Sequence, residues 1–298
     1  MRPAMFAGVR IMLTATGRTV SSVSLDDYAR TRGFSFSEVA DRLQLESSDV
    51  AYVTGSILDG LGDAQSDLDL YVLTSQTGFE RRQNSFAAER KHQQERRHFG
   101  IIYLEVAGGE IDVECHPIQK FYDLFAALDS LNFTDPELVQ ATFDSLGKYD
   151  RLEALELLHR LRIAKPFANE ESFRAFRSLF HEDQFFRWNT HTCLIQVGEG
   201  QKEVERSLKN DDYESAYLKL CRVFDVLIDA FLFSIGQSLD RWKWRLPKLR
   251  AAGRPDLLAR YLDVQMVRAN GSADLKRFIN EQLAASSLIQ DEIKDRLK

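Results

Sequence analysis

Residues 53–74 read VTGSILDGLGDAQSDLDLYVLT, and this stretch decides the fold that the sequence predicts. Two aspartates, Asp67 and Asp69, alternate here with Leu68 and Leu70. In a strand, residues i and i+2 point to the same side, so both carboxylates project from one face while both leucines enter a core. Aspartate is depleted in strands, and a carboxylate removed from water is costly unless it is paired or bound to a metal. The two aspartates therefore need a compensating partner.

The overall composition is that of a soluble globular protein. The chain has 298 residues, of which 44% are hydrophobic and 28% charged, and its net charge of −6 argues against a surface devoted entirely to nucleic acid or membrane. Three widely spaced cysteines form neither a disulfide framework nor a CxxC metal site. We find no apolar run of about 18 residues, so no membrane-spanning helix is expected. A cytoplasmic location without a membrane partner is expected.

The first 120 residues predict a small mixed sheet accompanied by short helices. Helical spacing, apolar runs rich in β-formers, and glycine-marked turns alternate along this part of the chain. The expected elements are one or two helices within residues 24–45, a strand at 50–54, a short helix at 57–61, a strand at 67–73, a charged helix or mobile loop at 79–99, and a hairpin of strands 101–106 and 111–116.

Beyond residue 120 the pattern is helical. Leucines recur on one face over residues 152–161, in a helix that must end near Pro166, and a second apolar stripe covers residues 213–231 and ends near Gly236. We therefore predict an α+β fold with two domains: a small mixed-sheet domain at residues 1–120 and an all-α helical domain at residues 121–298.

The carboxylates carry the most informative chemistry. Asp67 and Asp69 at this spacing could bridge two Mg²⁺ ions, because hard divalent cations prefer oxygen ligands and are commonly held by a few carboxylates plus substrate phosphates. A nucleoside triphosphate is the partner that such a site implies. Asp112 lies in a similar apolar context in the predicted hairpin, and Glu114 follows it on the same face. Asp112 is favoured over Glu114 as the third metal ligand.

Gly55 and Ser56 are suited to bind phosphate. Glycine lets backbone amides approach an anion closely, serine adds a hydroxyl donor, and a helix that starts here would direct its positive end at the phosphates. Ser66, which precedes Asp67, is a further nucleotide-binding candidate. Ser56 is also compatible with an ordinary helix cap.

Three separated elements resemble the signature of the nucleotidyltransferase superfamily typified by DNA polymerase β. They are Gly55-Ser56, the run from Asp67 to Leu70 after ten intervening residues, and Ile111-Asp112-Val113. The resemblance covers roughly residues 45 to 120. It implies the nucleotidyltransferase fold and the transfer of a nucleoside monophosphate from an NTP, expected to be ATP, to a hydroxyl-type acceptor with release of pyrophosphate. It also implies two Mg²⁺ ions held by Asp67, Asp69 and Asp112.

The chain departs from the family pattern in the phosphate loop. Bacterial relatives often have Gly-Thr and a basic residue near this point, whereas this chain has the acidic Asp59 and Asp63. In this superfamily a cation on a C-terminal helix commonly meets the triphosphate. The candidates for that role here are Lys219 and Lys243, together with Arg222, Arg241, Arg245 and Lys248, while Trp242 and Trp244 are candidates for stacking on a base or for packing.

Several readings of the function stay open. A small-molecule acceptor is favoured, and tRNA, a protein side chain or a second nucleotide are the alternatives. The basic run from Arg81 to Arg97 could contact phosphates of an RNA, although interleaved glutamates favour a solvated helix face. A catalytically silent nucleotide-binding or regulatory protein on the same fold is the remaining alternative.

Overall fold

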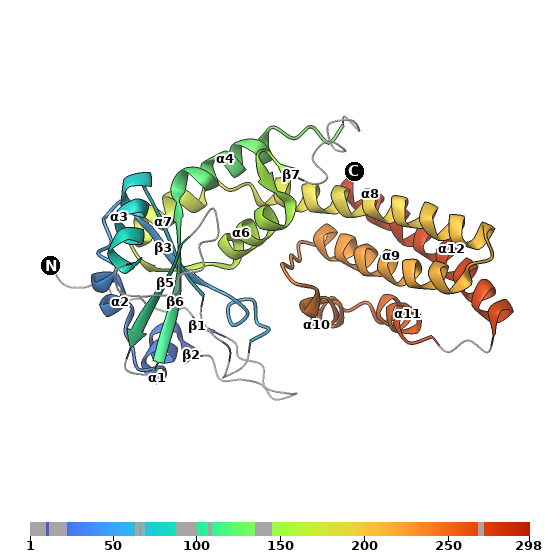
Figure 1. The fold of residues 1–298 in the computed structure, drawn as a ribbon, viewed down its shortest axis with the longest axis horizontal. Coiled ribbons are helices and arrows are strands. Elements are labelled where there is room, and N and C mark those ends of the chain that lie inside the picture. The colour runs from blue at the N-terminus through green and yellow to red at the C-terminus, as the bar shows by residue number, and fades with distance from the viewer. Residues whose placement is uncertain are drawn as a thin grey trace. The chain divides into compact units, whose positions relative to one another are not determined.

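The computed structural model describes residues 10–11, 23–62, 66, 69–87, 100–106, 109–134, 145–267 and 271–298 (Figure 1). The chain forms two compact units. The first joins Met1–Ala126 to Arg160–Phe180, and the second joins Ala127–His159 to His181–Lys298. The first holds a mixed sheet and the second is mainly helical, so the predicted α+β class is confirmed.

A five-stranded sheet organises the first unit. Its order is β5-β6-β4-β3-β9, with β4 and β6 parallel and the other neighbouring pairs antiparallel. The strands are β3 (Val50–Thr54), β4 (Asp69–Thr74), β5 (Gly100–Val106), β6 (Gly109–Pro117) and β9 (Lys165–Ala168). Strand β3 and the β5–β6 hairpin are confirmed as predicted.

One face of this sheet carries the main apolar core of the unit. Helices α1 (Leu25–Thr31) and α2 (Phe36–Arg42) contribute to it, as the glycine break at Gly33 predicts. Ser35 caps α2 by accepting a hydrogen bond from the Glu38 amide at 3.2 Å. Alternate strand residues fill this core because successive side chains point to opposite faces; they include Ala51, Val53, Leu70, Val72, Val113 and Cys115.

Aromatic rings cover part of the opposite face. Tyr52 and Tyr71 stack with centroids 5.3 Å apart, and Tyr71 stacks in turn on His116 at 5.5 Å. Phe121 of α4 (Ile118–Asp129) and Phe173 of α7 (Glu170–Arg177) pack at the two ends of this row. These rings do not cover the polar end of this face.

The predicted boundary at residue 120 differs from the division that the structure makes. The chain returns to the sheet unit after residue 159, and β9 pairs antiparallel with β3, with Val53 opposite Lys165. Helix α6 (Arg151–Ile163) leads into this strand and ends before Pro166, as predicted. The sheet therefore needs a segment that lies about 110 residues beyond β3.

The structure describes part of the elements that were predicted between residues 57 and 99. In place of the short helix predicted at 57–61, residues 57–60 form turns, because Gly60 adopts a φ of +75° and the chain closes on itself. Asp67 lies outside the described residues, and β4 begins at Asp69. Within the charged segment at 79–99, the described part continues α3 (Gln76–Ala87).

The second unit is built on three long helices. Helices α8 (Glu182–Lys209) and α9 (Tyr213–Ser234) form a hairpin, and α12 (Ser272–Leu297) packs against both (Figure 1). Asp212 caps α9 by accepting the Ser215 amide at 3.1 Å, and α9 is the apolar stripe that the sequence predicts. The other elements are the short 3₁₀ helix η1 (Trp242–Trp244), α10 (Arg245–Ala251) and α11 (Pro255–Gln265).

Among the described residues, two pairs of very short strands form small sheets of their own. These are β1 (Arg10–Ile11) with β2 (Val23–Ser24), and β7 (Ser145–Leu146) with β8 (Tyr149–Asp150). None of the helices that the structure describes has the length and apolar composition needed to cross a membrane.

Candidate functional site

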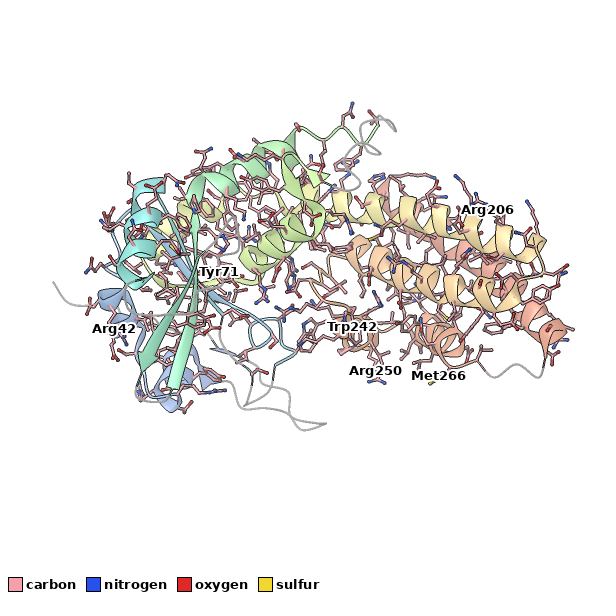
Figure 2. All side chains as sticks on the ribbon, in the orientation of Figure 1. Arg42, Tyr71, Arg206, Trp242, Arg250 and Met266 are labelled. Carbon is pink, nitrogen blue, oxygen red and sulfur yellow. The ribbon has the colours of Figure 1, made fainter. Side chains whose placement is uncertain are left out.

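Polar side chains lie on the sheet face opposite the α1–α2 core. In β6 the core-facing residues alternate with three polar ones, which are Asp112, Glu114 and His116. In β4 the same face carries Asp69 and Tyr71; Figure 2 labels the latter on the sheet. The alternation of a strand therefore separates a polar row from the core residues beside it.

Asp69 and Asp112 are neighbours on the two parallel strands. The register pairs Leu70 with Val113, so the two aspartates lie one residue earlier on adjacent strands, with α-carbons about 4.8 Å apart. Asp112 is exposed and the Asp69 side chain is 38% exposed. The structure thus brings two of the three predicted carboxylates together at a solvent-accessible edge of the row.

Arg160 is the cation that the sequence reasoning missed. Its guanidinium forms an ion pair with the Asp69 carboxylate, and only 6% of its side chain is exposed. The buried Thr54 hydroxyl donates to the Arg160 carbonyl at 2.8 Å, which fixes the end of α6 beside the end of β3. Arg160 therefore supplies a compensating charge for Asp69. The one signal for it in the sequence was the position of an arginine between Leu158 and Leu161 of the apolar stripe.

Glu114 is held inside the polar row rather than at its open end. Burial raises the pKa of this carboxyl, but nearby His116, the Tyr71 hydroxyl and the Arg160 charge together lower it by more, so the net pKa lies below the usual value. The closest His116 nitrogen is 3.4 Å from a Glu114 oxygen. Because the Glu114 carboxylate is engaged with these neighbours, the exposed Asp112 is the better candidate for a third metal ligand. Asp112 is also the residue that the sequence favoured.

The loop after β3 is a compact turn whose backbone closes on itself. The Gly55 carbonyl accepts the Leu58 and Asp59 amides at 3.1 and 3.2 Å, and the Ser56 carbonyl accepts the Leu61 and Gly62 amides at 2.9 and 2.8 Å. Among the described residues, no hydrogen bond is recorded from the Ser56 amide or hydroxyl. Both donors are therefore open to a ligand, and the phosphate-binding role of Gly55-Ser56 stays a prediction.

Gly55 has a φ of +105°, a region that residues with a β-carbon rarely adopt. We expect Gly55→Ala to destabilise the protein by about 1–3 kcal/mol through backbone strain and to weaken NTP binding. Gly198→Ala is the matched control, because this helical position in α8 has open space around an added β-carbon and should gain up to about 1 kcal/mol. Urea unfolding measures both, and equal stabilities of the two variants would contradict the strain.

Ser66 is tied to the first helix through its backbone. Its carbonyl accepts the Tyr28 hydroxyl and, at 3.1 Å, an Arg32 guanidinium nitrogen. Arg32 also donates to the Tyr28 hydroxyl at 2.9 Å. This places a second cation, absent from the sequence prediction, beside the residue that precedes Asp67.

The predicted cations of the helical unit do not form one group. Lys219 donates to the Ser207 hydroxyl at 2.9 Å, where α9 begins, whereas Lys243 lies in η1, beyond the end of α9, with its amine 4.5 Å from the Trp244 ring centre. The fifteen residues from Lys219 to the end of α9 span about 22 Å of helix. A single triphosphate is too short to meet both lysines.

Two further candidates have structural partners inside the helical unit. Arg245 bonds both oxygens of Asp229 at 2.6 and 2.9 Å and contacts Asp225 at 2.9 Å, and the buried Lys248 donates to the Ser238 carbonyl. These cations are already engaged within the unit, so a role as phosphate ligands, which stays a prediction, would require the loss of these bonds.

The predicted basic run from Arg81 to Arg97 is described only in its first part. Arg81 is 47% exposed and pairs with Glu46 at 2.7 Å, whereas the Arg82 side chain is 2% exposed and pairs with the buried Asp49. Arg90, Lys91, Arg96 and Arg97 lie outside the described residues. Burial removes Arg82 from any RNA-binding surface.

The donor set at the end of the polar row fits magnesium. Mg²⁺ is usually bound through one or two carboxylates plus substrate phosphates, and Asp69 and Asp112 supply two adjacent carboxylates. Within the described ranges, which omit Asp67, no cluster of three or more His, Cys, Asp or Glu side chains is arranged to hold a metal. The protein part of such a site would therefore rest on Asp69, Asp112 and the predicted Asp67.

Comparison with known proteins gives similarity to solved structures. No protein-family model matches the sequence. No curated protein matches it either. The chain is similar to a nucleotidyltransferase-like protein from Exiguobacterium sibiricum 255-15, with 9% identity and a TM-score of 0.48, over 90% of this chain and 75% of that one. A similarity of this size carries no argument about the family of this chain or the role of any residue.

Proposed function

We propose that this protein is a magnesium-dependent nucleotidyltransferase, which moves a nucleoside monophosphate from an NTP to a hydroxyl-type acceptor and releases pyrophosphate. The observation that supports it is the adjacent placement of Asp69 and Asp112 at the open end of the polar row. The strand that carries Asp69 pairs with β3, whose last residue, Thr54, directly precedes the Gly55-Ser56 turn. The carboxylates and the hydrogen-bond donors proposed to bind phosphate therefore lie at the same end of one sheet.

Each residue then has a definite task. Asp69 and Asp112, with Asp67, would hold the magnesium ions, and the Ser56 amide and hydroxyl would hold the terminal phosphates of the donor. Bound magnesium supplies activation of the acceptor hydroxyl and neutralisation of the leaving pyrophosphate. Arg160 orients the Asp69 carboxylate through their ion pair and adds positive charge at the same end of the sheet.

The acceptor is proposed to be a small hydroxyl compound. The net charge of −6 and the burial of Arg82 both count against a long polyanionic acceptor such as tRNA. A protein side chain and a second nucleotide remain the other acceptors that the same chemistry could serve. ATP is the proposed donor.

A second candidate is a catalytically silent nucleotide-binding protein. The Arg160–Asp69 ion pair favours it, since a guanidinium in contact with this carboxylate compensates its charge without any metal. The acidic Asp59 in the phosphate loop also favours this second candidate. In this case the chain binds the NTP and leaves it intact.

The test is release of labelled pyrophosphate from a panel of four NTPs, with Mg²⁺ or with EDTA, in the presence of pooled small alcohols, aminoglycosides or tRNA. The proposal expects release that requires magnesium and one acceptor class. Nucleotide binding without release under every condition would support the silent alternative and overturn the enzyme.

Asp112→Asn and Glu114→Gln form a matched pair within β6. We expect the Asp112 variant to lose about a hundredfold or more in transfer rate, because a metal ligand is removed, and the Glu114 variant to keep the rate within about tenfold. Initial rates at saturating NTP measure both, with the thermal midpoint as a check on folding. The reverse order would assign the third ligand to Glu114.

A further inference from the structure

The helical unit contains a pocket of about 470 Å³, within the size range of small-molecule sites. The described lining residues all belong to this one unit: they come from the first turns of α6, the middle of α8, the last turns of α9, and the segment around η1. The lining includes Arg151, Leu155, Cys193, Phe233, Trp242 and Lys243. None of these residues takes part in the site on the sheet.

The apolar part of the lining is exposed where the pocket opens. Leu155 and Leu239 are buried, but Leu152 is 65% exposed and Trp242 is 78% exposed, and both line the same pocket. Figure 2 labels Trp242 within the helical unit. Large apolar side chains that gather at one opening indicate a surface that a ligand covers. Trp242 can provide the flat contact for a ring.

The polar part contains a buried donor without an acceptor. Arg151 Nε is buried and has no hydrogen-bond partner among the described residues, and its Nη2 atom has only the weak acceptor Cys193 Sγ at 3.8 Å. A buried donor left unsatisfied costs about 1–3 kcal/mol, and more for a charged group. The other inner guanidinium, that of Arg245, is already bonded to Asp229. Arg151 is therefore the group that can gain most from an incoming anion.

The charge around the opening also favours an anion. Lys243 is exposed with its amine over the Trp244 ring, and Arg241 is 51% exposed with its nearest carboxylates at 3.7 and 3.9 Å. Asp240 is the one lining carboxylate beside these cations, because Asp229 is paired with Arg245. Among the described lining residues there are four cations and two carboxylates, and this balance favours a small anion.

We propose that this pocket binds a small organic anion. Its carboxylate or phosphate meets Arg151, and its ring packs on Trp242 and the leucines of α6. The proposal does not depend on nucleotide transfer at the sheet. Its readout is ligand binding, so its failure can be distinguished from failure of the proposed function.

Calorimetric titration of the full chain tests it with four probes. Benzoate and phenyl phosphate carry both the ring and the charge, whereas benzyl alcohol lacks the charge and inorganic phosphate lacks the ring. We expect saturable binding of at least one aromatic anion, at least about tenfold tighter than either comparator. The preferred aromatic anion identifies the charged group as carboxylate or phosphate. Absence of saturable binding at millimolar concentration, or equal binding of a comparator, overturns the proposal.

Variants locate the bound anion. Arg151→Met is expected to weaken the preferred probe at least about tenfold, since a charged hydrogen bond is lost, and Trp242→Ala is expected to weaken it severalfold. Arg206→Met, on an exposed part of α8 where it pairs with Glu203, is the control and should bind as the parent does. Trp242 is so exposed that its variant should fold even if the Arg151 variant does not. Unchanged binding in the Trp242 variant overturns the placement.

Discussion

Asp69→Asn is expected to reduce magnesium-dependent nucleotide transfer by about a thousandfold. The substitution keeps the size of the side chain but removes the charge that would hold the metal, and metal stabilisation of the transition state is worth several kcal/mol. Initial rates of pyrophosphate release over a range of Mg²⁺ concentrations measure the loss.

The control separates chemistry from folding. Asp69 also pairs with the largely buried Arg160, so its substitution should lower stability as well, and the thermal midpoint has to be measured beside the rate. Asp41→Asn, at an exposed position of α2 in the same unit, should change neither. A folded Asp69→Asn protein that transfers nucleotide at the parent rate would refute the assignment of this carboxylate.

Arg82→Met is expected to lower the free energy of unfolding by about 3–5 kcal/mol, the typical result of breaking a buried ion pair. The Arg82 guanidinium donates to the Leu43 and Gln44 carbonyls at 2.9 and 3.0 Å and pairs with Asp49, whose side chain is 1% exposed. These bonds tie α3 to the end of α2 and the start of β3. Removal of the arginine leaves Asp49 as an uncompensated buried charge, and urea denaturation measures the result.

The neighbouring arginine provides the comparison. Arg81→Met removes the same charge from the same helix, but its pair with Glu46 is about half exposed on both sides and should contribute less than about 1 kcal/mol. The Arg82 effect should therefore exceed the Arg81 effect severalfold. Similar values for the two variants would show that net charge, rather than the buried pair, sets the stability.

The parts of the fold that the sequence predicted are those with strong local patterns. Residues 50–54 combine β-formers with a following glycine, and the β5–β6 hairpin has apolar alternation on both sides of a glycine pair. Strand β9 has neither signal: its four residues, KPFA, include a proline, and only pairing with the distant β3 makes them a strand. The helix expected at 57–61 was wrong because the two glycines of that loop favour turns over a continued helix.

The same distinction holds in the candidate site. The alternation of Asp69 with Leu70 placed this carboxylate on the polar face from sequence alone, and the structure adds Asp112 beside it. Arg160 could not be predicted in this role, because its partner lies 91 residues away and its neighbours are leucines of an ordinary helix stripe. The internal partner of Arg245 could not be predicted either, because a basic segment indicates charge but does not show that Asp229 engages it.

The late arrival of β9 has a consequence for synthesis of the chain. The outer edge of β3 is closed only when residues 165–168 have left the ribosome, and at typical elongation rates the intervening 110 or so residues take roughly 6–22 s to make. Until then Ala51, Tyr52 and Val53, which are fully buried in the finished protein, lie on an unpaired strand edge of the kind that recruits other chains. Chaperone capture of the nascent chain should therefore concentrate in this interval, and a fragment that ends near residue 120 should aggregate where the full chain stays dispersed.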